Sequence, residues 1–449
     1  MRRNFFKAVL ALALGGCIAG SVAACGGSGS DENSITFYHY AVTSALNTQL
    51  EAKLAEFTEQ TGINVRRIPV SKDNYNATIS TRFTSSRNDM DVLYLDQPLL
   101  AQYANLLLNL DDYITESSDD SETVAADNDV GFAFNKNAFN ESAWETTVYN
   151  GSVYGIPLTI NTSVLFYNVA TIREAGGYSS DEEAVAAVNA IKTWDDLKQF
   201  ASGIDGLGST YALFGGMGSG GYMGWYTQCF VGASGGKLYD EATKTVLPDD
   251  DGTVTDAFEM IKYMFDNSPE AIYNSNSGFT GTTGDPSGNV IFSLSHSSDI
   301  EDLDVAYTTF GAIPFPGKTE EIGSVSNIGG ENLVIPSRSE NKEAALKLIQ
   351  FLVAEDCMSL LQQCTNNFAA VDKYATIDTF TTDTSSPTYQ MYSVVKTQLE
   401  TAQVRPVVAG WMQVNDNGIP TNLDNYIDGI KTVDEAIADI RTYAAQYLR

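Results

Sequence analysis

Basic residues and histidines are scarce in this chain of 449 residues. Its 26 Lys and Arg stand against 57 Asp and Glu, so the formal net charge is −31, and only two histidines are present. Nucleic acids and anionic membranes bind to basic surfaces, and the charge therefore argues against both as partners. It also makes a phosphate or polycarboxylate ligand less favourable. A neutral small molecule is the ligand that the composition favours.

Cysteines are few, and their spacing does not suit a metal site; whether a disulfide forms among them stays open. After the N-terminal segment only Cys229, Cys357 and Cys364 remain. Cys357 and Cys364 stand two turns apart in a helical pattern, which separates their Cα atoms by about 10 Å, too far for a bridge unless the helix breaks. Zinc is not expected, because His39 and His296 are the only histidines and no Cys-x-x-Cys spacing occurs. We expect no metal and no cofactor.

After the N-terminal segment the sequence has no long apolar run. No stretch there approaches the ~20 apolar residues that span a bilayer. Arg2, Arg3 and Lys7 make the start of the chain basic, and a run rich in small and apolar residues follows over 8–24, which is typical of an export signal that is removed. Val22-Ala23-Ala24-Cys25 resembles a bacterial lipobox, in which the cysteine is lipidated. We expect a signal peptide over 1–24 and a lipidated, flexible tether over 25–34.

Two points about this segment stay open. Leu14-Gly15-Gly16-Cys17 is a competing lipobox, although only Cys25 is followed at once by the flexible sequence GGSGS. The start RRNFFK suits a twin-arginine export signal as well as a Sec signal. An uncleaved anchor is the weaker alternative, because Gly and Ser dilute the apolar run. The segment predicts a protein held by lipid on the extracellular face of the cell membrane.

Strand and helix patterns alternate from Ile35 onward. ITFYHY at 35–40 predicts a buried strand, an apolar helical face follows over 46–57, and strands are predicted over 63–69 and 91–95. This order indicates right-handed crossovers and a mostly parallel sheet. Ligands of such sheets bind at the carboxyl ends of the strands. The residues expected at that edge are His39, Tyr40, Asp96 and Gln97.

The stretch NGSVYGIPLTINTSVLFYN, residues 150–168, predicts a chain that crosses between two lobes. Pro157 lacks a backbone donor, so the first short strand should leave its ladder there. A second β-rich run starts at Val164. The polar residues Thr159 to Ser163 would form the hinge between the two strands.

VYGIP followed by LFYN resembles the first inter-lobe crossing of the extracellular solute-binding proteins of ABC importers, sugar-binding type. TWDDL at 193–197, GG with IP over 329–336, the amphipathic helix after it and the tail from Arg405 occur in the same order. The resemblance covers the chain from Ile35 and implies an α/β, two-lobed, periplasmic-binding-protein-like fold. Each lobe would be a mostly parallel sheet flanked by helices.

The resemblance also implies three inter-lobe crossings and a division of the chain. The N-terminal lobe would take 35–160 and 281–317, and the C-terminal lobe 161–280 and 318–449. The second and third crossings would then fall at Phe279 to Thr283 and Pro316 to Gly323.

Two other motifs, one typical of dinucleotide binding and one of calcium binding, do not fit their surroundings in the sequence. Gly216, Gly218 and Gly221 match a G-x-G-x-x-G dinucleotide pattern with Asp240 as its acid, but no apolar strand leads to that acid. The run DDDG at 249–252 suggests a calcium loop, yet its glycine alignment places Leu247 and a phenylalanine at the first and last ligand positions. A polar turn before a helix explains it better.

A sugar site needs aromatic rings for apolar sugar faces and Asn, Asp or Gln for hydroxyls. Trp225 is the first choice for stacking, with core packing as the equal alternative, and Asn161 is weighed against a simple hinge cap. An acidic residue is common in the family where Asn161 stands, and an aromatic often follows GG where Glu331 and Asn332 stand, so ligand identity stays open. The expected ligand-binding residues are His39, Tyr40, Asp96, Gln97, Asn161, Tyr222, Trp225, His296, Glu331, Asn332 and Asp416.

The resemblance implies a monomeric substrate-binding lipoprotein, not an enzyme, that captures a neutral carbohydrate by hinge closure and delivers it to the permease subunits of an ABC importer. A glycan-degrading enzyme is one alternative. It needs two carboxylates at a defined separation, and 57 acidic residues make a search for such a pair uninformative. A tethered sensory or adhesion protein, which would lack a closing cleft, is the other.

Lipid anchoring should depend on Cys25. Because the thiol is the group that would be acylated, Cys25→Ser should release the protein from the membrane fraction, as measured by immunoblotting of fractionated cells. Cys17→Ser serves as the matched control and should leave the protein on the membrane. Retention of the Cys25→Ser variant would instead implicate Cys17 or an uncleaved anchor.

Overall fold

The computed structural model describes residues 33–40, 44–85, 89–117, 125–126, 132–215, 221–269, 289–300, 303 and 310–448. The predicted signal peptide, Cys25, most of the glycine-rich loop before α8 and the crossing proposed at 279–283 lie outside these residues. The side chain of Tyr222 is also outside the described part. Within it, no helix is both long enough and apolar enough to cross a bilayer.

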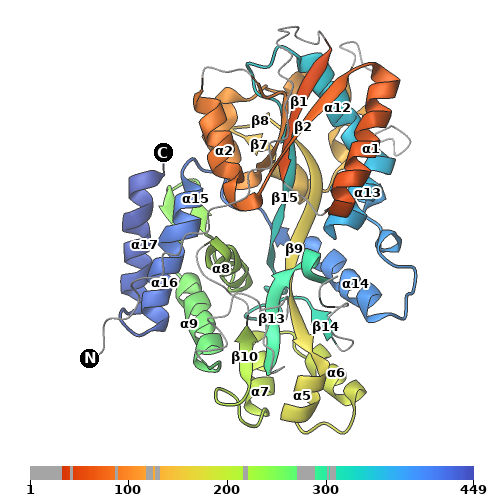
Figure 1. Ribbon diagram of the computed structural model, residues 1–449. Coiled ribbons are helices and arrows are strands. Elements are labelled where there is room, and N and C mark those ends of the chain that lie inside the picture. The colour runs from red at the N-terminus through yellow and green to blue at the C-terminus, as the bar shows by residue number, and fades with distance from the viewer. Residues whose placement is uncertain are drawn as a thin grey trace, which may run out of the picture.

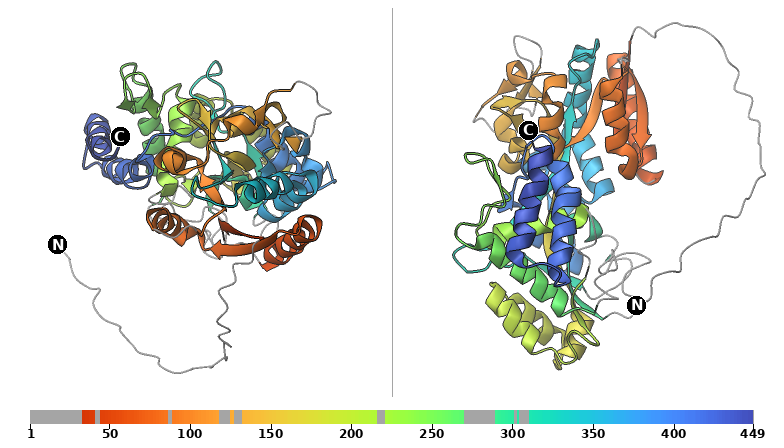
Figure 2. Two further views of the ribbon diagram at one scale, coloured as in Figure 1. Left: turned by 90° about the horizontal axis from the view of Figure 1, so that it is seen from above. Right: turned by 90° about the vertical axis from the view of Figure 1, so that its left-hand side faces the viewer.

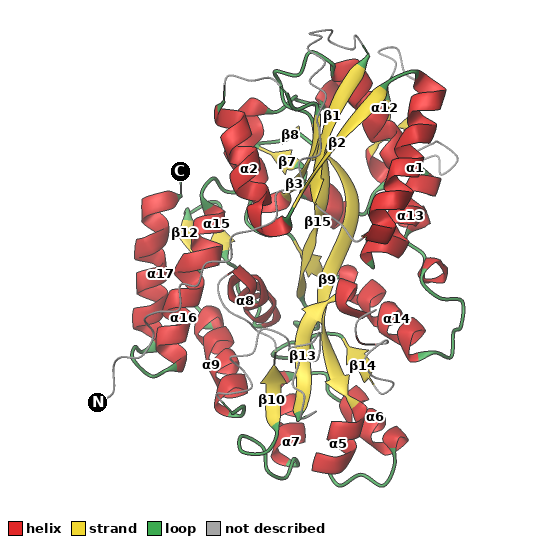
Figure 3. Ribbon diagram, in the orientation of Figure 1, coloured by secondary structure: helices red, strands yellow, loops and turns green. Residues whose placement is uncertain are grey.

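The first lobe is built on the strand, helix, strand pattern that the sequence predicts. Its strands β2, β1 and β3 lie side by side and pair in parallel, and apolar positions of α1 are buried against them. Helices α12 and α13, from much later in the chain, cover the same sheet (Figures 1 and 3). The bounds are β1 Ser34–Tyr40, α1 Ser44–Thr61, β2 Asn64–Val70, α2 Lys72–Thr84, β3 Val92–Asp96, α12 Lys342–Leu352 and α13 Glu355–Thr365.

The first crossing is one continuous strand, β9 (Ile156–Asn168), and not two strands with a polar hinge. It pairs antiparallel with a second long strand, β15 (Ser326–Val334), along the axis of the molecule. Pro157 does not end the ladder, because it lies beside a register shift where Thr159 pairs with Glu331 and Pro157 with Asn332. A proline is tolerated at such a bulge, where no ladder donor is needed.

The second lobe surrounds the other half of β9. β13 pairs with β10 and with β9, and β14 pairs with β9 from the opposite side. Figure 2 shows the C-terminal helices on one flank of this lobe. The bounds are α5 Val169–Ala175, α6 Asp181–Asn189, α7 Trp194–Ser202, β10 Ala212–Gly215, α8 Gly221–Ala233, α9 Thr253–Asp266, β13 Val290–His296, β14 Phe310–Ile313, α15 Trp411–Gln413, η8 Val414–Gly418, α16 Ile419–Ile427 and α17 Val433–Tyr447.

Smaller elements complete the described part. Short strands β4, β5 and β6 form a separate sheet, β7 pairs with β8, and β11 pairs with β12. α14 packs against β9 and β14, and β17 lies beside the start of β15. The bounds are α3 Leu100–Tyr103, β4 Ile114–Thr115, β5 Ala125–Ala126, β6 Ala133–Asn135, α4 Glu141–Glu145, β7 Val148–Tyr149, β8 Ser152–Val153, β11 Tyr239–Asp240, β12 Thr245–Val246, β16 Phe368–Ala369, α14 Pro387–Leu399 and β17 Ala402–Gln403.

The division of the chain between the lobes differs from the prediction. The segment placed in the first lobe, 281–317, carries β13 and β14, and in the described part of the chain these strands pair with β10 and with the second-lobe half of β9. The predicted crossing at Pro316 to Gly323 is held in the second lobe, because Trp194 donates its Nε1–H to the Pro316 carbonyl (2.8 Å) and its backbone N–H to Gly317 (2.9 Å).

The second crossing is therefore β15, and the chain from there through α13 belongs to the first lobe and not to the second. After α13 the chain reaches α14, which packs against β14 of the second lobe. The segment 403–410 then leads from β17 into α15. We call this segment the third crossing, because Arg405 within it contacts Asp96 of the first lobe and Trp225 of the second. Two apolar clusters form the core: one contains Phe37 and Leu348 of the first lobe and extends to β13 and β14, and the other surrounds Phe258 and Trp411 of the second lobe.

Two glycines allow β9 and β15 to lie so close together. Gly330 has φ +138, and a Cβ on it would meet the Thr159 carbonyl oxygen at 1.9 Å. A Cβ on Gly329 would meet Asn161 Oδ1 at 2.3 Å and the Trp225 ring at 2.5 Å. Only a residue without a side chain fits at either place.

Gly330→Ala should lower the free energy of unfolding by about 2 kcal/mol or more, because it adds a backbone clash to an unfavourable φ. Urea unfolding followed by circular dichroism measures this. Gly151→Ala is the matched control: Gly151 has φ +79 but open space around its Cβ position. It should show the φ cost alone, about 1 kcal/mol. Equal losses in the two variants would contradict the close approach at Gly330.

Candidate functional site

A cavity of about 570 Å³ lies where the two lobes and the crossing strands meet. Its walls come from three parts of the chain. The first lobe contributes Tyr40, Lys72, Asn76, Asp96 and Asn367. The second lobe contributes Trp225, His296, Ser298, Met412, Asn415 and Asp416. The crossings contribute Asn161, Gly329, Gly330, Glu331 and Arg405.

A larger cavity of about 710 Å³ lies between the β7–β8 hairpin, the β11–β12 hairpin and α17. Its arginine, Arg441, donates Nε–H to the Val246 carbonyl (3.0 Å) and Nη2–H to the Leu247 carbonyl. That guanidinium therefore holds backbone together. The smaller cavity carries the convergent aromatic, amide and carboxylate groups that a polar ligand needs, and we take it as the candidate site.

Most of the predicted site residues meet at this cavity. They come from the ends of β1 and β3, from both crossing strands, from α8, from the end of β13 and from η8, so the fold gathers them from distant parts of the chain. The predicted residues that line the cavity are Tyr40, Asp96, Asn161, Trp225, His296, Glu331 and Asp416.

The other predicted residues with described side chains do not line it, and strand alternation explains two of them. His39 precedes Tyr40 on β1 and points to the other face, where its Nδ1 lies 2.6 Å from the Tyr40 carbonyl and its Nε2 accepts from Arg67 Nε (3.1 Å). Asn332 follows Glu331 on β15 and is bound to Thr146, donating to its carbonyl (3.2 Å) and accepting from its hydroxyl (3.1 Å). Both side chains are buried.

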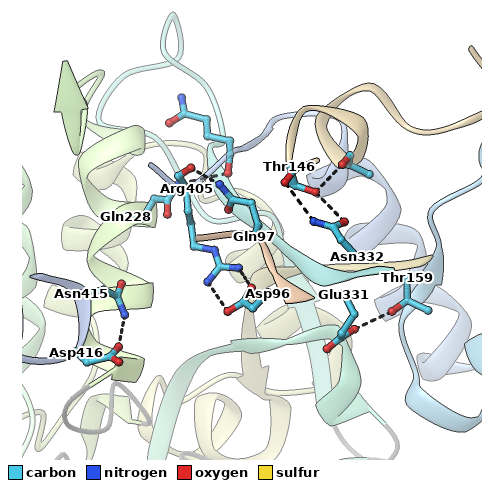
Figure 4. Close-up of polar contacts among 12 residues, drawn as sticks. Asp96, Gln97, Thr146, Thr159, Gln228, Glu331, Asn332, Arg405, Asn415 and Asp416 are labelled. Atoms are coloured by element: carbon cyan, nitrogen blue, oxygen red, sulfur yellow. Dashed lines mark hydrogen bonds and ion pairs between the residues drawn. The ribbon is translucent and has the colours of Figure 1, made fainter. Parts of the chain in front are cut away.

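Gln97 is the third predicted residue that does not line the cavity. Its side chain binds the backbone of the third crossing instead. It is 1% exposed, and its Nε2–H donates to the carbonyl of Arg405 (Figure 4). Its neighbour Asp96 does line the cavity, but its carboxylate is also engaged. Arg405 donates from Nη1 to Asp96 Oδ2 (3.2 Å) and from Nη2 to Oδ1.

Trp225 on α8 is held on several sides. Its Nε1–H donates to Ser163 Oγ (3.0 Å), the Arg405 guanidinium lies 4.5 Å from the ring centroid, and the His296 ring meets it edge-on at 5.2 Å. Contact with a cation over an aromatic face is attractive. The tryptophan is partly exposed, lines the cavity and packs against the second apolar cluster.

Burial sets the protonation of the cavity. Burial raises the pKa of Glu331. Its Oε2 accepts a hydrogen bond from Thr159 Oγ1 (3.0 Å), which by itself lowers that pKa. Burial also raises the pKa of Asp416, and nearby Asp96 adds to this. Burial lowers the pKa of His296 to about 3, with Lys72 and Arg405 adding to the effect, so this imidazole is neutral near pH 7.

Sequence reasoning missed several residues of the cavity. Lys72 and Asn76 lie one turn apart at the start of α2, directly after the carboxyl end of β2. The rule that ligands bind at the carboxyl ends of parallel strands, which selected Tyr40, could have selected them too. Asn415 stands beside the predicted Asp416 and donates to its carboxylate (2.8 Å). Arg405 carried no local signal, because its partner Asp96 is 309 positions away.

Two α/β lobes, joined by three crossings and enclosing a polar, aromatic-lined cavity, define a two-lobed binding protein of the periplasmic-binding-protein type. The model of one family, described as bacterial extracellular solute-binding protein, matches residues 40–356. The chain belongs to this family.

Solved structures share the fold. The GacH receptor of Streptomyces glaucescens GLA.O is 21% identical, with a TM-score of 0.67 over 92% of this chain and 98% of that one. The sugar-binding protein MalE from Xanthomonas citri is 18% identical, with a TM-score of 0.73 over 92% and 97%. The cyclic alpha-maltosyl-1,6-maltose binding protein from Arthrobacter globiformis is 16% identical, with a TM-score of 0.71 over 92% and 98%.

The histidines should make the protein less stable in mild acid. Burial places the pKa of His296 at about 3 and that of His39 at about 4, both below 6.5, so the unfolded chain takes up protons that the folded chain does not. The free energy of unfolding should therefore fall as the pH drops from about 6.5 to about 4, by up to about 1.4 kcal/mol per pH unit for each histidine.

Urea unfolding of the wild type, His296→Gln and the double variant His39→Gln/His296→Gln at pH 7 and pH 5 measures this contribution. The carboxyl groups with raised pKa act in the opposite direction, but they are common to all three proteins and cancel in the comparison. The decline between the two pH values should be smaller in each variant than in the wild type, and smallest in the double variant. An identical decline in all three would contradict neutral, buried imidazoles.

Proposed function

We propose that this protein is the substrate-binding lipoprotein of an ABC importer, and that it captures a neutral carbohydrate, an oligosaccharide, in the inter-lobe cavity. The single observation that carries the proposal is the cavity itself. An indole ring, a tyrosine, several amides and partly buried carboxylates converge there from both lobes. Rings of this kind cover the apolar faces of a sugar, while amides and carboxylates bind its hydroxyls.

The size and protonation of the cavity support a neutral sugar. About 570 Å³ lies within the range of small-molecule sites. His296 stays neutral, and the charge of Arg405 is already paired with Asp96, so the described lining residues offer no free, rigid cation fork for a phosphate. Lys72 is exposed on α2 at the cavity wall and can still contact a hydroxyl.

The names of the structural relatives point to the same ligand class. The GacH receptor structures include complexes with acarbose and an acarbose homologue, and another relative is bound to maltotetraose. A third is named for a cyclic maltosyl-maltose. Together with the lipobox at Cys25, these names support a tethered protein that passes an oligosaccharide to membrane permease subunits after the lobes close around it.

An oligosaccharide panel tests the proposal. The ligand-free protein is incubated with neutral oligosaccharides, binding is followed by calorimetry, and the sugars are recovered and analysed. Saturable binding with unchanged sugars is expected. Shortened sugars would mean a glycan-degrading enzyme, and no binding to any sugar would favour a sensory or adhesion protein.

Two variants test the site with the sugar that the panel identifies. Trp225→Ala should weaken binding about thirtyfold, about 2 kcal/mol, because a buried aromatic anchor is lost. Asn161→Ala should cost about 1 kcal/mol if its amide makes one neutral hydrogen bond to the ligand. Tyr239→Ala, in the other inter-lobe cavity, is the matched aromatic control and should bind as the wild type does. Unchanged affinity in Trp225→Ala would place the sugar elsewhere.

A further inference from the structure

Arg405 on the third crossing is bound to the first lobe through two consecutive residues. Its guanidinium is paired with the carboxylate of Asp96, which ends β3, and its carbonyl accepts the side-chain N–H of Gln97 (Figure 4). One contact uses the side chain and the other uses the backbone. The first lobe thus fixes both the position and the direction of Arg405.

The second lobe holds the same short segment from the other side. The Arg405 guanidinium lies 4.5 Å from the centroid of the Trp225 ring. Gln228 donates from Nε2 to the carbonyls of Gln403 and Val404, both at 3.3 Å. Trp225 and Gln228 are three positions apart on α8, so they lie on one face of that helix.

The arrangement is buried, and this makes it sensitive to the angle between the lobes. The side chain of Arg405 is 5% exposed, and no hydrogen-bond partner of its Nε occurs in the described part of the chain. The Asp96 carboxylate and the Trp225 ring are thus its main side-chain contacts. A two-pronged guanidinium–carboxylate pair depends strongly on geometry, so a rotation that moves Asp96 away from Trp225 would weaken both contacts together.

We propose that Arg405 is a positioning residue that couples ligand binding to the angle between the lobes. Asp96, Gln97, Trp225 and Gln228 form with it a unit that we call the Arg405 clamp. Since Asp96 and Trp225 also line the cavity, a ligand that touches either one acts on the clamp. This inference rests on the proposed function only for the identity of the ligand.

The clamp favours one lobe angle before any ligand is present. Without it the lobes sample a wider range of angles, and only a fraction of the molecules is ready to bind. The apparent dissociation constant rises in proportion as that fraction falls. Loss of the clamp should therefore change the ligand-free protein first and the affinity as a consequence.

The experiment measures the distance between two spin labels in the ligand-free protein. Labels are placed at Glu59→Cys on α1 and Ala438→Cys on α17, both exposed positions, in a Cys364→Ser background. The test variants are Arg405→Gln, which removes the charge, and Arg405→Lys, which keeps the charge but lacks the planar fork. Arg82→Gln is the matched control.

Arg82 makes the same kinds of contact within one lobe. It donates to Asp89 Oδ2 (2.5 Å) and lies 5.9 Å from the centroid of the Tyr38 ring. Its substitution therefore removes an ion pair and a cation–π contact without touching the hinge, and it should leave the label distances as they are in the parent protein.

The distance distribution should broaden and shift in Arg405→Gln, and should do so to a smaller extent in Arg405→Lys. If Arg405→Gln does not fold, the comparison is made with Arg405→Lys alone. Affinity for the sugar found by the panel should fall about tenfold in Arg405→Gln if the competent fraction falls tenfold. Unchanged distances in both Arg405 variants, or the same change in Arg82→Gln, would overturn the clamp. If the wild type binds no sugar, the proposed function fails, but the distances of the ligand-free protein still decide the role of Arg405.

Discussion

The antiparallel pairing of β9 with β15 is the constraint on which the rest of the structure depends. Each strand runs through both lobes, and their register extends from Thr162 with Ile328 to Ile156 with Leu333. The same pairing sets Asn161 opposite Gly329, so the strands that connect the lobes also form a wall of the cavity. A ligand on this wall touches the elements about which the lobes would turn.

A buried polar network beneath that wall joins the two strands to α8. Ser163 accepts from the Trp225 indole, and its hydroxyl donates to Asn327 Oδ1 (3.2 Å), while Asn327 Nδ2 donates to the Trp225 carbonyl (2.8 Å). Cys229 lies against the same asparagine at 3.4 Å. Such groups are costly to bury unless they are paired, so the network permits few arrangements of Trp225. Burial raises the pKa of Cys229 to about 11, which keeps this thiol protonated.

The charge of the cavity differs from that of the whole chain. The protein carries a formal net charge of −31, yet an arginine with 5% exposure lies at the centre of the site, paired with Asp96. The raised pKa values of Glu331 and Asp416 and the lowered pKa of His296 share one cause, which is burial away from water. The site therefore has a smaller net charge than the composition of the whole chain suggests.

Local patterns in the sequence were enough for several of the elements and for the family. The predicted strands β1 and β2 and the apolar face of α1 appear in the structure, and Thr193 caps α7 through the box that TWDD indicates. The acidic run near Asp249 is a polar turn, in which Asp249 accepts the backbone N–H groups of Val254 (2.7 Å) and Thr255 (3.1 Å) at the start of α9. In each case the interacting residues are neighbours along the chain, so the sequence alone determined the outcome.

The tertiary structure decided which lobe each later segment joins and which polar residues reach the cavity. Strand pairing across long separations took β13 and β14 into the second lobe. Alternation along β1 and β15 turned His39 and Asn332 away, while Tyr40 and Glu331 faced the site. Asp96 and Arg405, 309 positions apart, meet only because the third crossing passes the end of β3. No short-range preference records such a contact, since it exists only after both lobes have folded and the crossing lies between them.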